Sequence, residues 1–142
     1  MGELKAGLRG EQDMIVGRQD LASVMGNIGA EVLSTHRLVL LMEMAARSAL
    51  DGRLPEGKIT VGTFVQIKHY AATPLGLAVR AEAYLRKIDG RRLTFDVAAY
   101  DEFEKIAEGQ NEQLIVSKEK YLIGTRRKTL GRMTAKNQEN SP

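Results

Sequence analysis

The sequence predicts an α+β fold in which an antiparallel sheet packs on one long helix. Residues 38–46, LVLLMEMAA, are apolar on every side of a helical wheel except at Glu43, as expected of a helix surrounded by protein. Four runs of alternating hydrophobicity follow it, at 58–70, 76–88, 91–101 and 104–117. A sheet with one apolar face needs a cover, and this helix is the segment apolar enough to provide it.

The first part of the chain predicts a further strand at 4–16, because its apolar residues share one parity: Leu4, Ala6, Leu8, Met14 and Val16. A glycine-containing stretch follows, GRQDLASVMGNIGAE, which predicts a short helix and a loop. The central helix should end near Gly52 and Pro55, which are stop signals.

The four strand-like runs are joined by short turns, so we expect a meander of antiparallel strands. In the first run, period two places a set of mostly apolar side chains on one face: Ile59, Val61, Thr63, Val65 and Ile67. His69 continues that face and should therefore point toward the helix.

Length and composition indicate one domain, which we expect to span 1–133, with a disordered tail at 134–142. No apolar run reaches the roughly 18 residues that a membrane span needs, and the N-terminus lacks the apolar stretch of a secretory signal. The chain has no cysteine, which excludes disulfides and thiolate chemistry. We expect a cytoplasmic protein with no membrane partner.

The net charge of +3 is concentrated at the C-terminal end. From Lys118 onward the chain has seven Lys or Arg and two Glu, a net of +5, so residues 1–117 carry −2. This segment has one aromatic residue and no nucleic-acid-binding motif. We therefore expect a solvated or phosphate-contacting end and no nucleic-acid partner.

Glu43 is the first candidate for chemistry, because a carboxylate in an apolar helix needs a cation or hydrogen-bond donors. The residue on the facing sheet best able to donate to it is His69. A carboxylate beside an imidazole is used repeatedly in acid–base and nucleophilic catalysis. The alternative is a satisfied buried pair with no catalytic role.

Ser34 and Thr35 precede the helix, where either hydroxyl can cap it and either can act as a nucleophile or orient a substrate. Thr35 would stand about 12 Å from Glu43 if both lay in one straight helix. The two can then cooperate only if the segment with Thr35 folds back, or if the site draws on two subunits. His36 reads as a partly exposed loop residue, and two histidines in such different settings predict no metal site.

Four stretches carry a family resemblance: LSTHRLVLLMEMAA, VGTFVQIKHYAATPLG, VRAEAYLRKIDGRRLTFDVAAYDE and KIAEGQNEQLIV. The chain resembles the hotdog-fold thioesterases, and within them the fluoroacetyl-CoA thioesterase family. The resemblance implies a long helix wrapped by an antiparallel sheet, a homodimer joined edge to edge, and hydrolysis of acyl-CoA thioesters. It places the catalytic residues at Thr35, Glu43 and His69, and the glycine nearest the acyl group at Gly62.

The chain departs from that family at two places. Gly109 to Gln113 read Gly-Gln-Asn-Glu-Gln, where such proteins commonly have Gly-Thr-His-Glu-Arg. The loop SVMGNIGAEVLST has no aromatic residue, whereas similar proteins that discriminate for fluoroacetyl groups have phenylalanines there. An aromatic lid is therefore absent.

The leading functional hypothesis is an acyl-CoA thioesterase in which Glu43 and His69 activate Thr35 or a water. One alternative is a non-catalytic module that binds acyl-CoA or another ligand. A less favoured one is a hotdog hydratase, whose motif Glu31 and His36 match in spacing alone. No cofactor is expected, since coenzyme A is part of the substrate. With no glycine-rich phosphate loop, its phosphates would fall to basic side chains: Arg91, Arg92, Arg126, Arg127 and Lys128.

Overall fold

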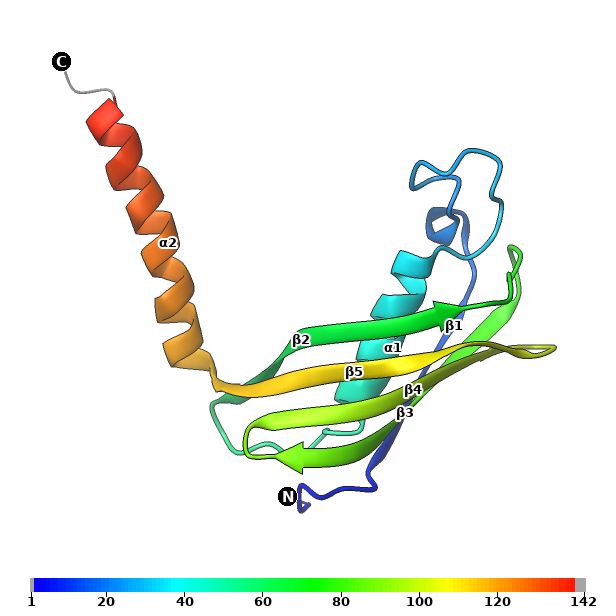
Figure 1. Cartoon of the computed structure of the whole chain (residues 1–142), viewed down its shortest axis with the longest axis horizontal. Coiled ribbons are helices and arrows are strands. Elements are labelled where there is room, and N and C mark those ends of the chain that lie inside the picture. Colours follow the sequence, from blue (N-terminus) through cyan, green and yellow to red (C-terminus); the bar gives the residue numbers. More distant parts are fainter. Residues whose placement is uncertain (1, 140–142) are drawn as a thin grey trace.

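The computed structural model describes residues 2–139 and contains a five-stranded antiparallel sheet with a helix across one face (Figure 1). The helix on the sheet is α1 (Thr35–Ser48), and a second helix, α2 (Lys118–Glu139), extends away from it. The strands are β1 (Arg9–Ile15), β2 (Lys58–His69), β3 (Ala78–Asp89), β4 (Arg92–Asp101) and β5 (Lys105–Ser117). The α+β prediction is confirmed.

The strand order is β1-β3-β4-β5-β2, which corrects the expected meander. β3, β4 and β5 do follow one another as neighbours, but β2 pairs with β5 instead of β3. The connection at 70–77 is too long for a tight hairpin, so it carries the chain across to the other side of the sheet. β1 and β2 consequently form the two edges.

The core lies between α1 and the alternate residues of β3 and β4. Leu38, Leu41 and Ala45 on α1 are fully buried, as are Leu85 and Phe95 on the sheet. Burial of each large side chain contributes about 1.5–3 kcal/mol. The N-terminal strand meets α1 closely at Gly10, where any side chain would collide with the Ala45 carbonyl. The central helix is thus fixed to the β1 side of the sheet.

The opposite side of α1 is less covered than the sequence predicts. Leu40 is 46% exposed, and Val65, which faces α1 from edge strand β2, is 38% exposed. The helix is therefore surrounded by protein on only part of its circumference within one chain. This apolar surface borders the free edge of β2.

A β-bulge divides β2 and corrects its predicted face pattern. Gly62 lies opposite Gln113, but Phe64 lies opposite Glu112, so Thr63 is an extra residue. Residues paired directly across antiparallel strands share a face. Val65, Ile67 and His69 therefore face α1 as predicted, whereas before the bulge it is the even-numbered residues that face it.

The C-terminal segment also differs from expectation. Residues 134–139, predicted to belong to a disordered tail, form the last turns of α2, and 140–142 lie outside the described residues. Helical periodicity is weak there because basic residues interrupt the apolar ones, which hid the helix in the sequence. The described side chains of α2 are all exposed. Within residues 2–139, no helix is long and apolar enough to cross a membrane.

Candidate active site

The first turn of α1 carries a hydroxyl that contacts a histidine. Ser34 is the N-cap, and its Oγ accepts a hydrogen bond from the Arg37 amide (3.1 Å). Thr35 is thereby left as the first helical residue, exposed, with its Oγ1 2.9 Å from His69 Nδ1. The structure brings these two predicted residues together from opposite ends of the α1–β2 segment.

His69 ends β2 opposite the buried Ala107, with its ring turned toward the start of α1. Its Nε2 is buried and has no hydrogen-bond partner within residues 2–139. Burial lowers the pKa of His69 below the usual 6.5, an effect that the backbone of Ala71 partly opposes. The imidazole is therefore neutral at pH 7, and in the tautomer that carries its proton on Nε2 the Nδ1 can accept a hydrogen bond from Thr35 Oγ1.

Asp20, which sequence reasoning missed, fixes the loop before α1. It ends the 3₁₀ turn η1 (Arg18–Asp20) and is only 6% exposed. Its carboxylate accepts hydrogen bonds from Arg37 Nε (3.1 Å) and the Gly17 amide (2.8 Å), and its carbonyl accepts one from the Ser34 amide (2.8 Å). The start of α1, and with it Thr35, is held in place from both sides.

A cavity of about 270 Å³ lies beside Thr35 and His69. Its other walls are mainly small and apolar, including Ala22, Ala30 and Ala72. The loop that forms one wall also projects three aliphatic side chains into solvent: Val24, Met25 and Ile28. The cavity suits a small uncharged group next to a reactive hydroxyl.

Glu43 does not contact His69 within one chain, so the expected pairing is wrong at this level. Its carboxylate instead meets Arg47, one turn along α1, at 3.5 Å. It also faces Gly62, where an added Cβ would stand 3.4 Å from Glu43 Oε2. Thr35 begins the same helix eight residues earlier, about 12 Å away, so the segment with Thr35 does not fold back.

A chain of buried side-chain hydrogen bonds holds the bulge that brings Gly62 to Glu43. Thr60 Oγ1 donates to Gln113 Oε1 (2.7 Å), Gln113 Nε2 donates to Asn111 Oδ1 (2.8 Å), and Asn111 Nδ2 donates to the Phe64 carbonyl (3.0 Å). Asn111 and Gln113 are two of the positions at which the sequence departs from the resembling family. Here they support the strand instead of offering an imidazole and a guanidinium.

The similarity of the chain to known proteins identifies its family. The family model described as fluoroacetyl-CoA-specific thioesterase matches residues 16–119, most of the chain. The chain belongs to this thioesterase family. The fluoroacetyl-CoA thioesterase of Streptantibioticus cattleyicolor is 39% identical over 99 residues, which cover 70% of this chain and 71% of that protein.

Solved structures agree with this thioesterase assignment. A variant of the fluoroacetyl-CoA-specific thioesterase in complex with fluoroacetate and CoA is similar with a TM-score of 0.78 and 32% identity, over 83% of this chain and 99% of that one. A thioesterase superfamily member from Thermus thermophilus is similar with a TM-score of 0.84 and 28% identity, over 95% and 99% of the two chains. The predicted hotdog fold and thioester hydrolase class are confirmed.

The predicted phosphate anchors of this thioesterase lie away from the Thr35–His69 cavity. Arg91 is in the turn between β3 and β4, and Arg92 begins β4. Three others lie exposed along α2: Arg126, Arg127 and Lys128. Within residues 2–139, no three acidic or histidine side chains gather into a metal site.

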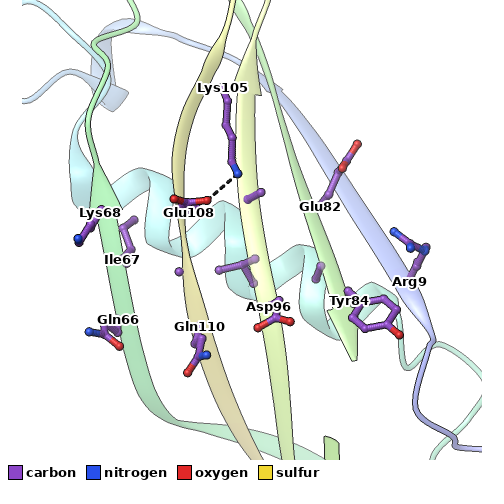
Figure 2. Close-up of a pocket in the computed structure, with 14 residues that line it drawn as sticks. Arg9, Gln66, Ile67, Lys68, Glu82, Tyr84, Asp96, Lys105, Glu108 and Gln110 are labelled. Atoms are coloured by element: carbon purple, nitrogen blue, oxygen red, sulfur yellow. Dashed lines mark hydrogen bonds and ion pairs between the residues drawn. The ribbon is translucent and has the colours of Figure 1, made fainter. Parts of the chain in front are cut away.

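A second hollow, of about 530 Å³, lies on the sheet face away from α1 (Figure 2). Its charges have both signs. Lys105 Nζ donates to Glu108 Oε2 (2.6 Å), and Asp96 and Glu82 add further carboxylates. Because Thr35 and His69 open on the opposite face, this hollow is not part of the candidate active site.

Proposed function

We propose that this chain hydrolyses acyl-CoA thioesters as a homodimer, and that each active site combines residues of two subunits. Thr35 and His69 come from one subunit, and Glu43 and Gly62 from the other. The observation that carries the proposal is the 2.9 Å contact between the exposed Thr35 hydroxyl and the partly buried, neutral His69. A hydroxyl positioned on an imidazole beside a small cavity is suited to attack on an acyl carbon.

The free edge of β2 supports the two-subunit site. Unpaired strand edges invite pairing, and this edge also exposes Phe64 and Val65. Two copies of β2 paired antiparallel about Val65, with the bulged Thr63 left unpaired, would place His69 of one opposite Thr60 of the other, two residues from Gly62 and on the same face. Glu43 lies against Gly62 and would arrive with it. A dimer of this kind supplies a carboxylate to His69, whose Nε2 has no partner among residues 2–139 of its own chain.

The reaction follows from these positions. His69 Nδ1 accepts a proton from Thr35 Oγ1, or from a water bound there, as that oxygen forms a bond to the thioester carbonyl carbon. The carbon–sulfur bond then breaks, and the CoA thiolate leaves and takes up the proton. If Thr35 attacks, the acyl group is left as an ester on Thr35 Oγ1. A water activated by Glu43 of the partner subunit then attacks the ester carbon, the bond from that carbon to Oγ1 breaks, and the acid and the free hydroxyl are released. If water attacks, the acid forms in one displacement.

The acyl group is small and apolar in this proposal, because the cavity walls are small and uncharged. The Streptantibioticus cattleyicolor relative is named for fluoroacetyl-CoA. The loop beside the cavity in this chain bears aliphatic residues instead of aromatic ones: Val24, Met25 and Ile28. We therefore propose activity on short acyl-CoA thioesters in general, without strong preference for the fluorinated group.

Initial rates over a panel of acyl-CoA thioesters, read as free thiol, test this function. The expected result is turnover of short-chain substrates, with acetyl-CoA and fluoroacetyl-CoA within about tenfold of each other. Binding of acyl-CoA without thiol release from any member would support the non-catalytic module instead. Light scattering at micromolar concentration should give a dimer, and a monomer would contradict the two-subunit site.

A further inference from the structure

A hollow of about 290 Å³ lies where α2 leaves the sheet, and three basic side chains line it. Lys58 begins β2, Arg91 lies in the β3–β4 turn, and Lys120 is in the first turn of α2. Ser117 and Tyr121 add hydroxyl groups, and no lining residue is acidic. We propose that this hollow binds the phosphate groups of the coenzyme A substrate, an inference that rests on the proposed function.

The three cations are held on backbone segments that are fixed to one another. The Lys118 amide donates to the Gly57 carbonyl (2.9 Å), which joins the root of α2 to the start of β2. The Ile115 amide donates to the Arg91 carbonyl (2.8 Å), which joins the turn to β5. The convergence of the basic groups therefore comes from the fold and not from loop mobility.

The three basic side chains of the hollow have no acidic partner among the described residues. Within residues 2–139 the side chains of Lys58, Arg91 and Lys120 make no ion pair or hydrogen bond. Other cations of the sheet do, such as Arg86 with Asp96 at 3.1 Å and Lys105 with Glu108 at 2.6 Å. Three unpaired positive groups around one hollow repel each other, and a phosphate accepts hydrogen bonds from all of them.

The hollow on the other sheet face shows the contrast. It is larger, but Glu82, Asp96 and Glu108 offset its basic groups, so it offers an anion no net attraction (Figure 2). Charge composition, and not volume, distinguishes the hollow at the root of α2.

The proposed dimer places this hollow beside the other subunit's active site. Lys58 precedes Gly62 by four residues, about 13 Å along the strand. If Gly62 of one subunit meets Thr35 and His69 of the other, its hollow lies one pantetheine arm away from the thioester. One subunit would then hold the phosphates of the substrate that its partner cleaves. The proposed phosphate site therefore consists of Lys58, Lys120 and the predicted anchor Arg91, and it includes none of the outer cations of α2.

The test uses two double variants. The first carries both Arg91→Ala and Lys120→Ala. The matched control carries both Arg132→Ala and Lys136→Ala, and so loses the same charge from the outer part of α2. Adenosine 3′,5′-bisphosphate is titrated calorimetrically into each protein. We expect the first variant to bind about tenfold or more weakly and the control to match the parent within about twofold. Equal losses in both would indicate diffuse attraction by the helix and overturn the site.

Kinetics separate this inference from the proposed function. The first variant should raise KM for acetyl-CoA with kcat retained, and leave KM for acetyl-pantetheine unchanged, because that substrate has no phosphate. Turnover with an unchanged KM would overturn the hollow while leaving the thioesterase intact. Bisphosphate binding that Arg91→Ala weakens, in a parent that cleaves no thioester, would overturn the function while leaving the site. Inorganic phosphate binding as tightly as the bisphosphate would contradict a nucleotide ligand.

Discussion

The two ends of the α1–β2 pair differ in what they offer a substrate. At one end, the side chains of Thr35 and His69 are hydrogen-bonded to each other, and Thr35 is exposed to solvent. At the other, Glu43 lies against Gly62, and within residues 2–139 its ionic partner is Arg47. The first end thus offers a hydroxyl and an imidazole, and the second offers a carboxylate. Under the proposed function, each chain would therefore hold two half-sites.

The largest loss of activity should come from replacing His69 at one end or Glu43 at the other. His69→Gln removes the proton acceptor of Thr35 and should lower kcat by about two to four orders of magnitude, with KM less affected. Glu43→Gln should do the same, and the double variant should be little worse than the poorer single one, because members of one catalytic unit are not additive. Initial rates of thiol release by the folded variants measure kcat and KM.

The matched control for that prediction is His36→Gln, which changes the other histidine of the chain. His36 is exposed, and its side chain has no hydrogen bond within the described residues. It should keep the parent rate. His69→Gln protein that folds normally and works within a few-fold of the parent would refute a catalytic His69.

The pH profile sharpens the difference between the two ends. Burial lowers the pKa of His69, so the imidazole stays neutral through pH 7 and is protonated only below the usual 6.5. A protonated ring cannot accept from Thr35, so kcat/KM should be level near neutrality and fall on acidification by about tenfold per pH unit below that pKa. An activity that rises as the pH falls from 7 to 5 would contradict this assignment.

The position of Gly62 against Glu43 depends on the β-bulge in β2. Asn111→Ala removes the hydrogen-bond partner of Gln113 Nε2 and of the Phe64 carbonyl, which should cost about 1–3 kcal/mol in the free energy of unfolding. Activity should fall as well, because Gly62 would no longer be held against Glu43. Gln110→Ala, on the same strand but the outer face, is the control and should change stability little. Denaturant titration of both variants decides, and equal losses would show that the network has no special role.

The smallest effect should come from the end of α2. Removing residues 134–142 deletes exposed side chains in the described part of the helix, so the free energy of unfolding should change by less than about 0.5 kcal/mol. Thermal unfolding of the shortened chain measures this. A large loss of stability would mean that this segment packs on a surface, such as a second subunit.

Much of the fold was predictable because alternation is a local signal. β3 and β4 begin and end within two residues of the predicted runs, since their buried faces are regular: Val79, Ala81, Ala83 and Leu85 on one, Leu93, Phe95, Val97 and Ala99 on the other. The pairing of β2 with β5 was not predictable in this way, because strand order depends on contacts between segments distant in sequence. The bulge at Thr63 was hidden for the same reason.

The residues of the candidate site were easier to select from the sequence than their contacts. Glu43 and His69 stand out by type and position, and the family resemblance selected Thr35 over Ser34. The Glu43–His69 pairing assumed that the carboxylate would find its partner across the core. In the structure, the Glu43 carboxylate instead forms an ion pair with Arg47 on the same helix, and this (i, i+4) spacing is visible in the sequence. Asp20 gave no signal, because its role depends on a loop conformation that no motif encodes.

The shared active site can be tested by mixing two inactive variants. His69→Gln and Glu43→Gln chains are co-refolded so that subunits exchange, and thiol release is compared with that of each variant alone. If each site spans two subunits, half of the dimers are mixed and each has one intact site, so activity should recover to about a quarter of the parent value. If each site lay within one chain, every mixed dimer would carry two broken sites. Activity that stays at the level of the single variants would contradict the account.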